Sequence, residues 1–198
     1  MKNERNFHLD TELGKGLKTL FNELQFRLQL QAPIKVYIAG GIAIHLYTAY
    51  RVSMDVDAEF SARLHLPADL GIEVMGPNGR PLWLHFDTQY NSTFALMHED
   101  YLDDAERVPL AVEYFDIHVL SPVDLAVSKI SRFAKNDQED ISALVLHGLT
   151  TADAIEKRAL DALPGFVGNV GPLKLNIRDA VEIARQAEAR KFDGAAKG

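Results

Sequence analysis

The stretch VYIAGGIAIHLYTAYRVSMDVDAEF, residues 36–60, contains the features that decide the fold. Its apolar beginning predicts a buried strand that ends at the pair Gly40-Gly41. An apolar segment with helical character follows, and MDVDAEF is typical of a second strand, which carries Asp55 and Asp57. Residues i and i+2 of a strand point to the same side, so these aspartates are predicted to lie about 6.6 Å apart at Cα.

Two carboxylates this close repel each other unless a cation lies between them. Hard divalent ions such as Mg²⁺ or Mn²⁺ take oxygen ligands, usually one or two carboxylates together with substrate phosphates. A third carboxylate from a neighbouring strand would complete a two-metal site for phosphoryl transfer and would orient or deprotonate the attacking hydroxyl. Asp87, which ends the apolar run PLWLHFD, is the first candidate for this third group, and Asp116 in YFDIHVL is the alternative.

The glycine pair fits the same chemistry. Gly40-Gly41 stands where a strand is predicted to pass into a helix, and glycine lets the backbone come close to a ligand. The start of that helix has free N–H groups that favour phosphate. We therefore expect a phosphate site beside the aspartates.

The N-terminal half of the chain has further element signals. Leucines at helical spacing predict a first helix from the cap Asp10 to before Pro33. Residues 71–90 are typical of two strands joined by a Gly-Pro-Asn-Gly turn, and YFDIHVL predicts another strand. The aromatic residues of the hairpin region are interpreted as core packing: Trp83, Phe86, Tyr90 and Phe94.

Helices are predicted for the remainder of the chain. Ser121-Pro122 is a helix start, and the helix VDLAVSKISRFAK would place Lys129, Arg132 and Lys135 on one side. QEDISALVLHG predicts the next helix, the segment 163–176 is read as a loop, and Asn176 is predicted to cap the last helix.

These elements predict an α+β fold, a small mixed β-sheet flanked by helices with a helical C-terminal part. We expect a core with its N-terminal helix over residues 1–148 and a helical extension over residues 149–198 that packs on the core.

The chain has 198 residues, a net charge of −7 and no cysteine. The absence of cysteine excludes disulfides, zinc–thiolate sites and thiol catalysis, and the acidic balance disfavours broad capture of nucleic acid. No apolar run approaches the ~20 residues that cross a bilayer, so a cytoplasmic protein without a membrane partner is expected.

Gly-Gly, a short helix and RVSMDVD resemble the first motif of the DNA polymerase β-like nucleotidyltransferase superfamily. The chain is similar in particular to the AbiEii-type and related uncharacterised bacterial nucleotidyltransferase-like proteins. The later segment VLSPVDLAVSKISRFAKNDQEDISAL also resembles that group, so the resemblance covers roughly residues 34–146. It implies metal binding by Asp55 and Asp57, triphosphate contacts by Gly40, Gly41 and Ser53, a nucleotide-facing Lys129, and a role near the same pocket for Asp137 or Asp140. These last two aspartates fit equally well as caps of the following helix.

Three functions follow as hypotheses. The first is a metal-dependent nucleotidyltransferase that moves an NMP from an NTP to a hydroxyl of a protein, RNA or small-molecule acceptor. The second is a catalytically weak or inactive relative that works with a cognate antitoxin-like protein in a toxin–antitoxin-like pair. Asn136, which stands where the resemblance leads us to expect an arginine, motivates this second hypothesis. The third is a phosphohydrolase that uses the same carboxylates with water as the nucleophile.

Overall fold

The computed structural model describes residues 5–195, and side chains up to residue 191. The chain forms two compact units, one with residues 5–90 and 105–119 and the other with residues 91–104 and 120–195. The boundary predicted at residue 148 falls within the second unit. None of the helices in the described range is long and apolar enough to cross a membrane.

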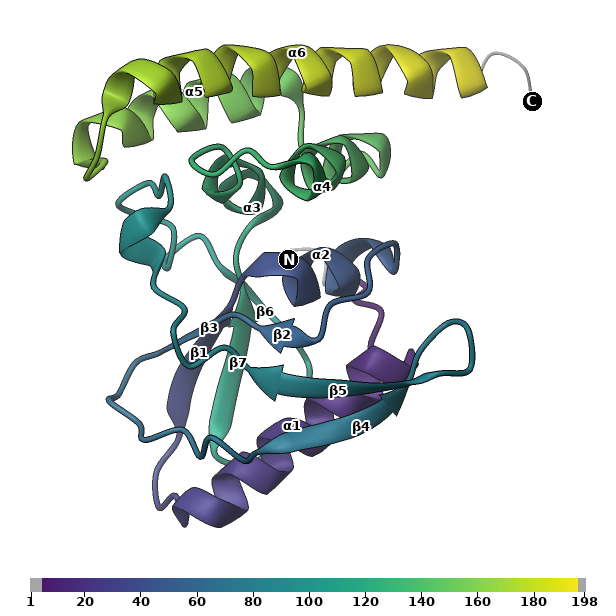
Figure 1. Cartoon of the computed structure of the whole chain (residues 1–198), viewed down its shortest axis with the longest axis vertical. Coiled ribbons are helices and arrows are strands. Elements are labelled where there is room, and N and C mark those ends of the chain that lie inside the picture. Colours follow the sequence, from purple (N-terminus) through teal and green to yellow (C-terminus); the bar gives the residue numbers. More distant parts are fainter. Residues whose placement is uncertain (1–4, 196–198) are drawn as a thin grey trace. The chain divides into compact units, whose positions relative to one another are not determined.

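The first unit contains two small mixed sheets (Figure 1). Its elements are α1 (Glu12–Leu28), β1 (Ile34–Ile38), α2 (Gly40–Thr48), β2 (Asp55–Val56), β3 (Ala58–Phe60), β4 (Gly71–Met75), β5 (Pro81–Phe86), β6 (Glu106–Arg107) and β7 (Phe115–Val119). The four-stranded sheet has the order β3-β1-β7-β6, in which only β1 and β7 run parallel. The three-stranded sheet has the order β2-β5-β4, with β2 parallel and β4 antiparallel to β5. The predicted α+β class, the hairpin and the strands at 34–38 and 115–119 are confirmed.

The segment MDVDAEF is not the single strand that the sequence predicts. It is divided at Asp57 into β2 and β3, which belong to different sheets. The backbone changes partner at this point: the Val56 carbonyl accepts from the N–H of Asp87, and the Asp57 carbonyl accepts from the N–H of Ala39. Asp57 therefore lies at a junction between the two sheets.

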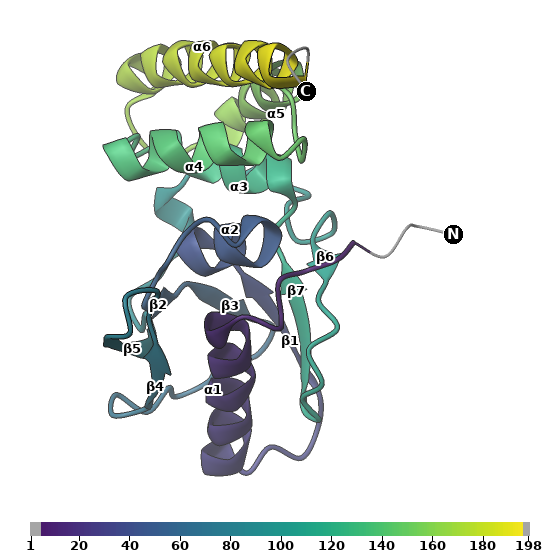
Figure 2. The same ribbon diagram turned by 90° about the vertical axis from the view of Figure 1, so that its right-hand side faces the viewer.

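Helix α1 supplies the core of this unit. Its Phe21 is fully buried and packs edge-on against Phe86 of β5 and Phe115 of β7, with ring centroids 5.2 Å apart in both pairs. Figure 2 shows α1 between the β4–β5 hairpin and the strands β1 and β7. The cap of α1 is Thr11 and not the predicted Asp10, because the Thr11 hydroxyl accepts from the N–H of Gly14 at 3.0 Å.

The second unit is helical. Its elements are η1 (Ser92–Phe94), α3 (Pro122–Ser128), α4 (Lys135–Leu146), α5 (Ala152–Ala162), η2 (Leu163–Gly165) and α6 (Val170–Ala195). The predicted start of α3 is confirmed: Ser121 caps the helix, with Pro122 at its first position. Helix α3 ends at Ser128, well before the predicted end, and Phe133 adopts a left-handed φ of 50° between α3 and α4. The three basic residues of this region therefore do not share one helix face.

The last helix begins earlier than the sequence predicts. Helix α6 starts at Val170, so half of the predicted loop is helical and Asn176 lies inside the helix. The Asn176 amide donates to the carbonyl of Ile130 at 3.0 Å, which ties α6 to the segment after α3. One apolar face of this helix is buried and consists of Ile177, Ala180, Val181, Ala184 and Ala187.

Candidate active site

The start of α2 is built around a contact between Gly40 and Asp57. Gly40 has a left-handed φ of +62°, and a Cβ at this position would overlap the Asp57 carboxylate. Only glycine accepts both this backbone conformation and this close approach. The Asp57 carboxylate is thus held against the first residue of α2.

A second close contact joins Gly41 to the loop that precedes β2. A Cβ at Gly41 would come within 2.7 Å of Ser53 Oγ and 3.0 Å of Arg51 Nε. The bare backbone of Gly41 therefore lets Ser53 pack on the helix start. Because the first N–H groups of a helix have no partner within the helix, this is a place where a phosphate is stabilised. The structure brings Gly40, Gly41, Ser53 and Asp57 together, as their assignment to one site requires.

The other two aspartates belong to the parallel strand pair β2 and β5: Asp55 begins β2, and Asp87 follows β5. Asp55 is exposed, and its Oδ1 lies 3.3 Å from Nδ1 of His85, its partner in the strand register. Asp87 directly follows β5 and donates its N–H to the Val56 carbonyl at 3.1 Å. The register pairs 55 with 85 and 56 with 86, so Asp57 and Asp87 are next neighbours at the carboxyl ends of the two strands. Neighbouring strands are about 4.8 Å apart.

Asp116, the alternative third carboxylate, is committed to other partners. Its Oδ1 accepts from Arg107 at 2.8 Å, and its Oδ2 lies 3.1 Å from His118 Nε2. The hydrogen bond from His118 is the main cause that lowers the pKa of Asp116, with Arg107 adding to it. Asp116 also lies in the four-stranded sheet, away from the β2–β5 pair. The geometry therefore favours Asp87 over Asp116.

The donor set of Asp55, Asp57 and Asp87 is chemically suited to Mg²⁺, which prefers carboxylate oxygens. Among residues 5–195, no three histidine or acidic side chains are already gathered closely enough to enclose an ion. Of the three, Asp57 is the one that contacts the start of α2, whereas Asp55 begins β2 and Asp87 follows β5.

His45 of α2 holds the loop that carries Arg51 and Ser53. The imidazole is buried, with Nδ1 at 2.6 Å from the Arg51 carbonyl and Nε2 at 2.8 Å from the Thr11 hydroxyl. Burial lowers the pKa of His45, and the Arg51 carbonyl opposes this shift only in part. The neutral ring donates from Nδ1 to Arg51. No local sequence pattern indicated that this histidine positions the loop.

The three remaining predicted residues form a buried charged cluster in the second unit. Lys129 is the C-cap of α3 and is 7% exposed, and its Nζ lies 3.0 Å from Asp140 Oδ2 and 3.8 Å from Asp137 Oδ1. Arg132 donates to both oxygens of Asp137, at 2.8 and 2.7 Å. Burial opposes the ionisation of Asp137, yet Arg132 and Lys129 keep its pKa below the ordinary value.

Asp137 also stabilises the start of α4. Its Oδ2 accepts from the N–H of Ala134 at 2.9 Å, the contact expected of an acidic residue in the first helical turn. The capping alternative is thus confirmed for Asp137. A nucleotide contact by Lys129, Asp137 or Asp140 stays a prediction.

Two aromatic residues that were predicted to pack in the core lie on the surface, Trp83 of β5 and Phe94 of η1. Phe86 is buried, whereas Trp83 is 52% exposed and Phe94 is 77% exposed, so the prediction was wrong for these two. Leu82, Leu84 and Phe86 alternate with Trp83 and His85 along β5. This alternation places Trp83 on the outer face, and it was the feature of the sequence from which the exposure of Trp83 could have been predicted.

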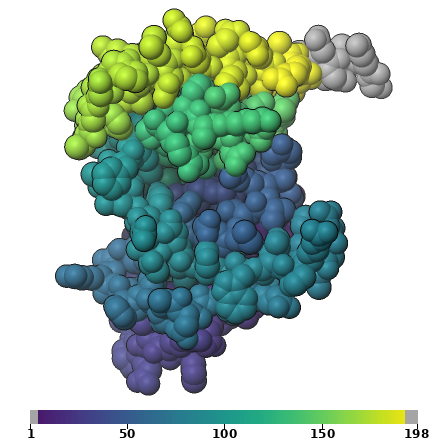
Figure 3. Space-filling view, in the orientation of Figure 1, coloured from purple at the N-terminus to yellow at the C-terminus, as the bar shows by residue number. Residues whose placement is uncertain are grey.

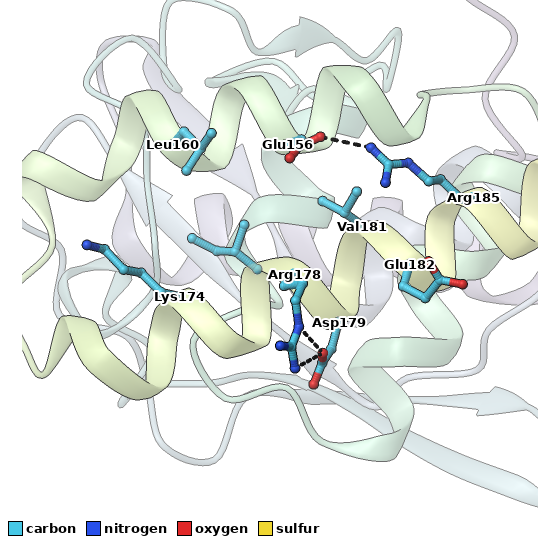
Figure 4. Close-up of a pocket in the computed structure, with 9 residues that line it drawn as sticks. Glu156, Leu160, Lys174, Arg178, Asp179, Val181, Glu182 and Arg185 are labelled. Atoms are coloured by element: carbon cyan, nitrogen blue, oxygen red, sulfur yellow. Dashed lines mark hydrogen bonds and ion pairs between the residues drawn. The ribbon is translucent and has the colours of Figure 1, made fainter.

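A groove of about 480 Å³ lies between α5 and α6 in the second unit (Figure 4). Its floor includes Ile177 and Val181, and the pair Glu156–Arg185, at 3.1 Å, lies at its rim. None of the predicted site residues lines this groove, so its presence does not bear on the group at Gly40 and Asp57.

One family model matches the chain. It describes a nucleotidyltransferase of unknown function (DUF6036), and it matches residues 15–170, a range that contains every candidate site residue. No curated protein matches the chain, and no solved structure does.

Proposed function

The chain belongs to this family of nucleotidyltransferases, and on that premise we propose that it is a metal-dependent enzyme that moves an NMP from an NTP to an acceptor hydroxyl. The observation that supports this most is the contact of Gly40 with Asp57. It places a carboxylate beside a helix start that suits phosphate, which is the combination that phosphoryl transfer needs.

Each part of the group has a role in this proposal. The triphosphate binds at Gly40, Gly41 and Ser53, where backbone N–H groups are available. Asp55, Asp57 and Asp87 are the residues that would hold Mg²⁺ or Mn²⁺, which would supply positive charge to offset the charge that develops on the phosphates. Asp87, beside Asp57 at the strand end, orients the acceptor hydroxyl and takes its proton.

A closer relationship to AbiEii-type proteins is part of the same proposal. The segments RVSMDVD and SPVDL support a likeness to AbiEii-type proteins, and with it a cytoplasmic enzyme. In that relationship Lys129 contacts the nucleotide, and Asp137 and Asp140 hold the lysine in place. Their short distances to Lys129 suit this supporting role.

One observation favours the second candidate function, a catalytically weak partner of an antitoxin-like protein. The Lys129 ammonium is buried and already neutralised by Asp140, an arrangement that serves stability without any nucleotide. An unreactive relative would keep this cluster and the fold.

Labelled NTPs with Mg²⁺ or Mn²⁺ and cell extract test the proposal. The wild-type protein should label an acceptor, and the double variant Asp55→Asn/Asp57→Asn should not. Glu113→Gln, an exposed carboxylate of the same unit, is the matched control and should behave as the wild type. Equal labelling by the double variant would refute the role of these carboxylates. Release of free phosphate without transfer would indicate the phosphohydrolase.

A further inference from the structure

The outer face of the three-stranded sheet continues from the candidate active site. Alternation along the strands turns one set of side chains away from α1, while Val74 and Leu84 face Gly16 of that helix. We name this surface the acceptor face, and it consists of Asp55, Gly71, Glu73, Met75, Trp83 and His85. Figure 3 shows the atoms of the hairpin at the front of the first unit, with no other segment of that unit over them.

The geometry of phosphoryl transfer directs the acceptor to this face. In the transition state the attacking and leaving oxygens lie roughly in line on the phosphorus. With the triphosphate at Gly40 and Gly41, the pyrophosphate leaves toward α2, so the hydroxyl must approach from the opposite side. Going away from α2, the strands follow in the order β2, β5, β4 (Figure 1). The acceptor therefore approaches over β5 and β4.

Trp83 is the main feature of the acceptor face. It is the only tryptophan of the chain. Its indole lies against the backbone of Gly71, where a Cβ would overlap the ring, and 52% of the residue is still exposed. The ring is thus held in place on one side and open to a ligand on the other. A cation over a tryptophan face is attracted by the ring quadrupole.

The charge of the acceptor face selects for a positive ligand. Glu73 of β4 is exposed and lies directly opposite Trp83 of β5 in the strand register. Asp55 is exposed on β2, on the other side of β5. None of the residues in β2, β4 and β5 is a lysine or an arginine. Such a surface repels the phosphates of a nucleic acid, which proteins bind with basic side chains. It complements lysine or arginine next to the aromatic ring.

The strand order indicates what kind of molecule carries that charge. In the described part of the chain, β4 is an edge strand of its sheet, on the side away from β2. An edge strand offers unpaired N–H and C=O groups, to which an extended peptide can add by main-chain hydrogen bonds. Met75, which is 50% exposed, adds apolar contact along this edge.

We propose that the acceptor is an extended, positively charged protein segment that binds along β4 with a lysine or arginine against Trp83 and Glu73. This inference rests on the proposed function and names its substrate class. A serine, threonine or tyrosine oxygen of the segment forms a bond to the α-phosphorus of the NTP. The bond from that phosphorus to the bridging oxygen of the β-phosphate breaks, pyrophosphate leaves, and the hydroxyl proton passes to Asp87.

Because Trp83 is the only tryptophan, its fluorescence reports binding at the acceptor face. The probes are a serine peptide flanked by lysines, the same peptide flanked by glutamates, and a single-stranded oligoribonucleotide. Only the lysine peptide should change the Trp83 emission, and added salt should weaken the effect. Glu73→Lys should weaken peptide affinity by about five-fold or more, since it removes one attraction and adds a repulsion. Glu113→Lys has the same net charge and should leave the affinity unchanged.

The inference is overturned if the oligoribonucleotide binds as tightly as the lysine peptide, if no peptide changes the emission, or if Glu73→Lys and Glu113→Lys behave alike.

Thermal stabilisation by NTP with Mn²⁺ tests the proposed function separately, because it depends on the Gly40 site. Stabilisation by NTP together with transfer of label to the RNA refutes only the acceptor class. A protein that no NTP stabilises refutes the proposed function, whatever the peptides do. The expected result is NTP stabilisation and transfer of label to the lysine peptide.

Discussion

The Asp57 carboxylate is packed against the Cα of Gly40, at a position where any side chain would overlap it. This contact joins the start of α2 to the junction between the two sheets. It makes the glycine a requirement both of the fold and of the candidate active site.

Replacement of this glycine should damage stability and nucleotide binding together. Gly40→Ala should lower the free energy of unfolding by about 2 kcal/mol or more, because it adds left-handed strain and displaces Asp57. Urea unfolding measures the first effect, and thermal stabilisation by NTP with Mn²⁺ measures the second. Gly165→Ala is the control, since a Cβ at Gly165 would meet no atom within 4 Å. A Gly40→Ala protein as stable as the control would contradict this reading of the contact.

Single carboxylate variants should identify the third acidic residue. Asp57→Asn and Asp87→Asn should each lower the transfer rate by about 100-fold or more, because each removes an anionic oxygen ligand of the proposed Mg²⁺ site and Asp87 is also the proposed proton acceptor. Asp116→Asn should leave the rate unchanged, since Asp116 is held by Arg107 and His118. The measurement is the initial rate of NMP transfer at saturating NTP. A rate that falls with Asp116→Asn and not with Asp87→Asn would exchange the two assignments.

His45 should make stability depend on pH on the acidic side. Burial lowers its pKa in the folded protein, so the unfolded chain binds a proton at a higher pH than the folded one does. The stabilisation is complete above the unfolded pKa of about 6.5 and is lost as the pH falls below it. His45→Asn keeps a side-chain N–H for the Arg51 carbonyl and should show a smaller loss of unfolding free energy between neutral and acidic pH. Equal pH dependence of the two proteins would contradict the assignment.

The buried pair Lys129–Asp140 should show a large coupling. Asp140→Leu leaves the Lys129 ammonium buried with only the more distant Asp137, and should cost about 3 kcal/mol. The double variant Lys129→Met/Asp140→Leu should recover most of this loss, because it removes the uncompensated charge. Urea unfolding of the wild type, both single variants and the double variant completes a double-mutant cycle and gives the coupling free energy of the pair. If the double variant were as unstable as Asp140→Leu, the cluster would not act as an ion pair.

Some features of the fold were predictable because they depend on local patterns. The leucine spacing of α1, the alternation of β5 and the Ser121-Pro122 start of α3 each record which side of an element is buried, or how it begins. The end of α3 was not predictable in this way. The segment after Ser128 has helical composition, yet Phe133 turns the chain so that Arg132 reaches Asp137.

The candidate active site likewise has features that the sequence predicts and features that it does not. That Gly40-Gly41 and the paired aspartates belong together follows from the order strand, glycine pair, helix, strand, which is local. That Asp87 and not Asp116 lies beside Asp57 depends on the pairing of β2 with β5. This pairing joins segments about 30 positions apart in the printed sequence.

By itself the sequence determined most element types, the class of fold and the candidate residues for phosphate transfer, because periodicity, glycine and charge act over a few neighbouring positions. Only the tertiary structure decided that MDVDAEF divides at Asp57 and that Lys129 is buried. The physical reason is that backbone partners and burial are supplied by segments far away along the chain, and no local pattern specifies which segment that is.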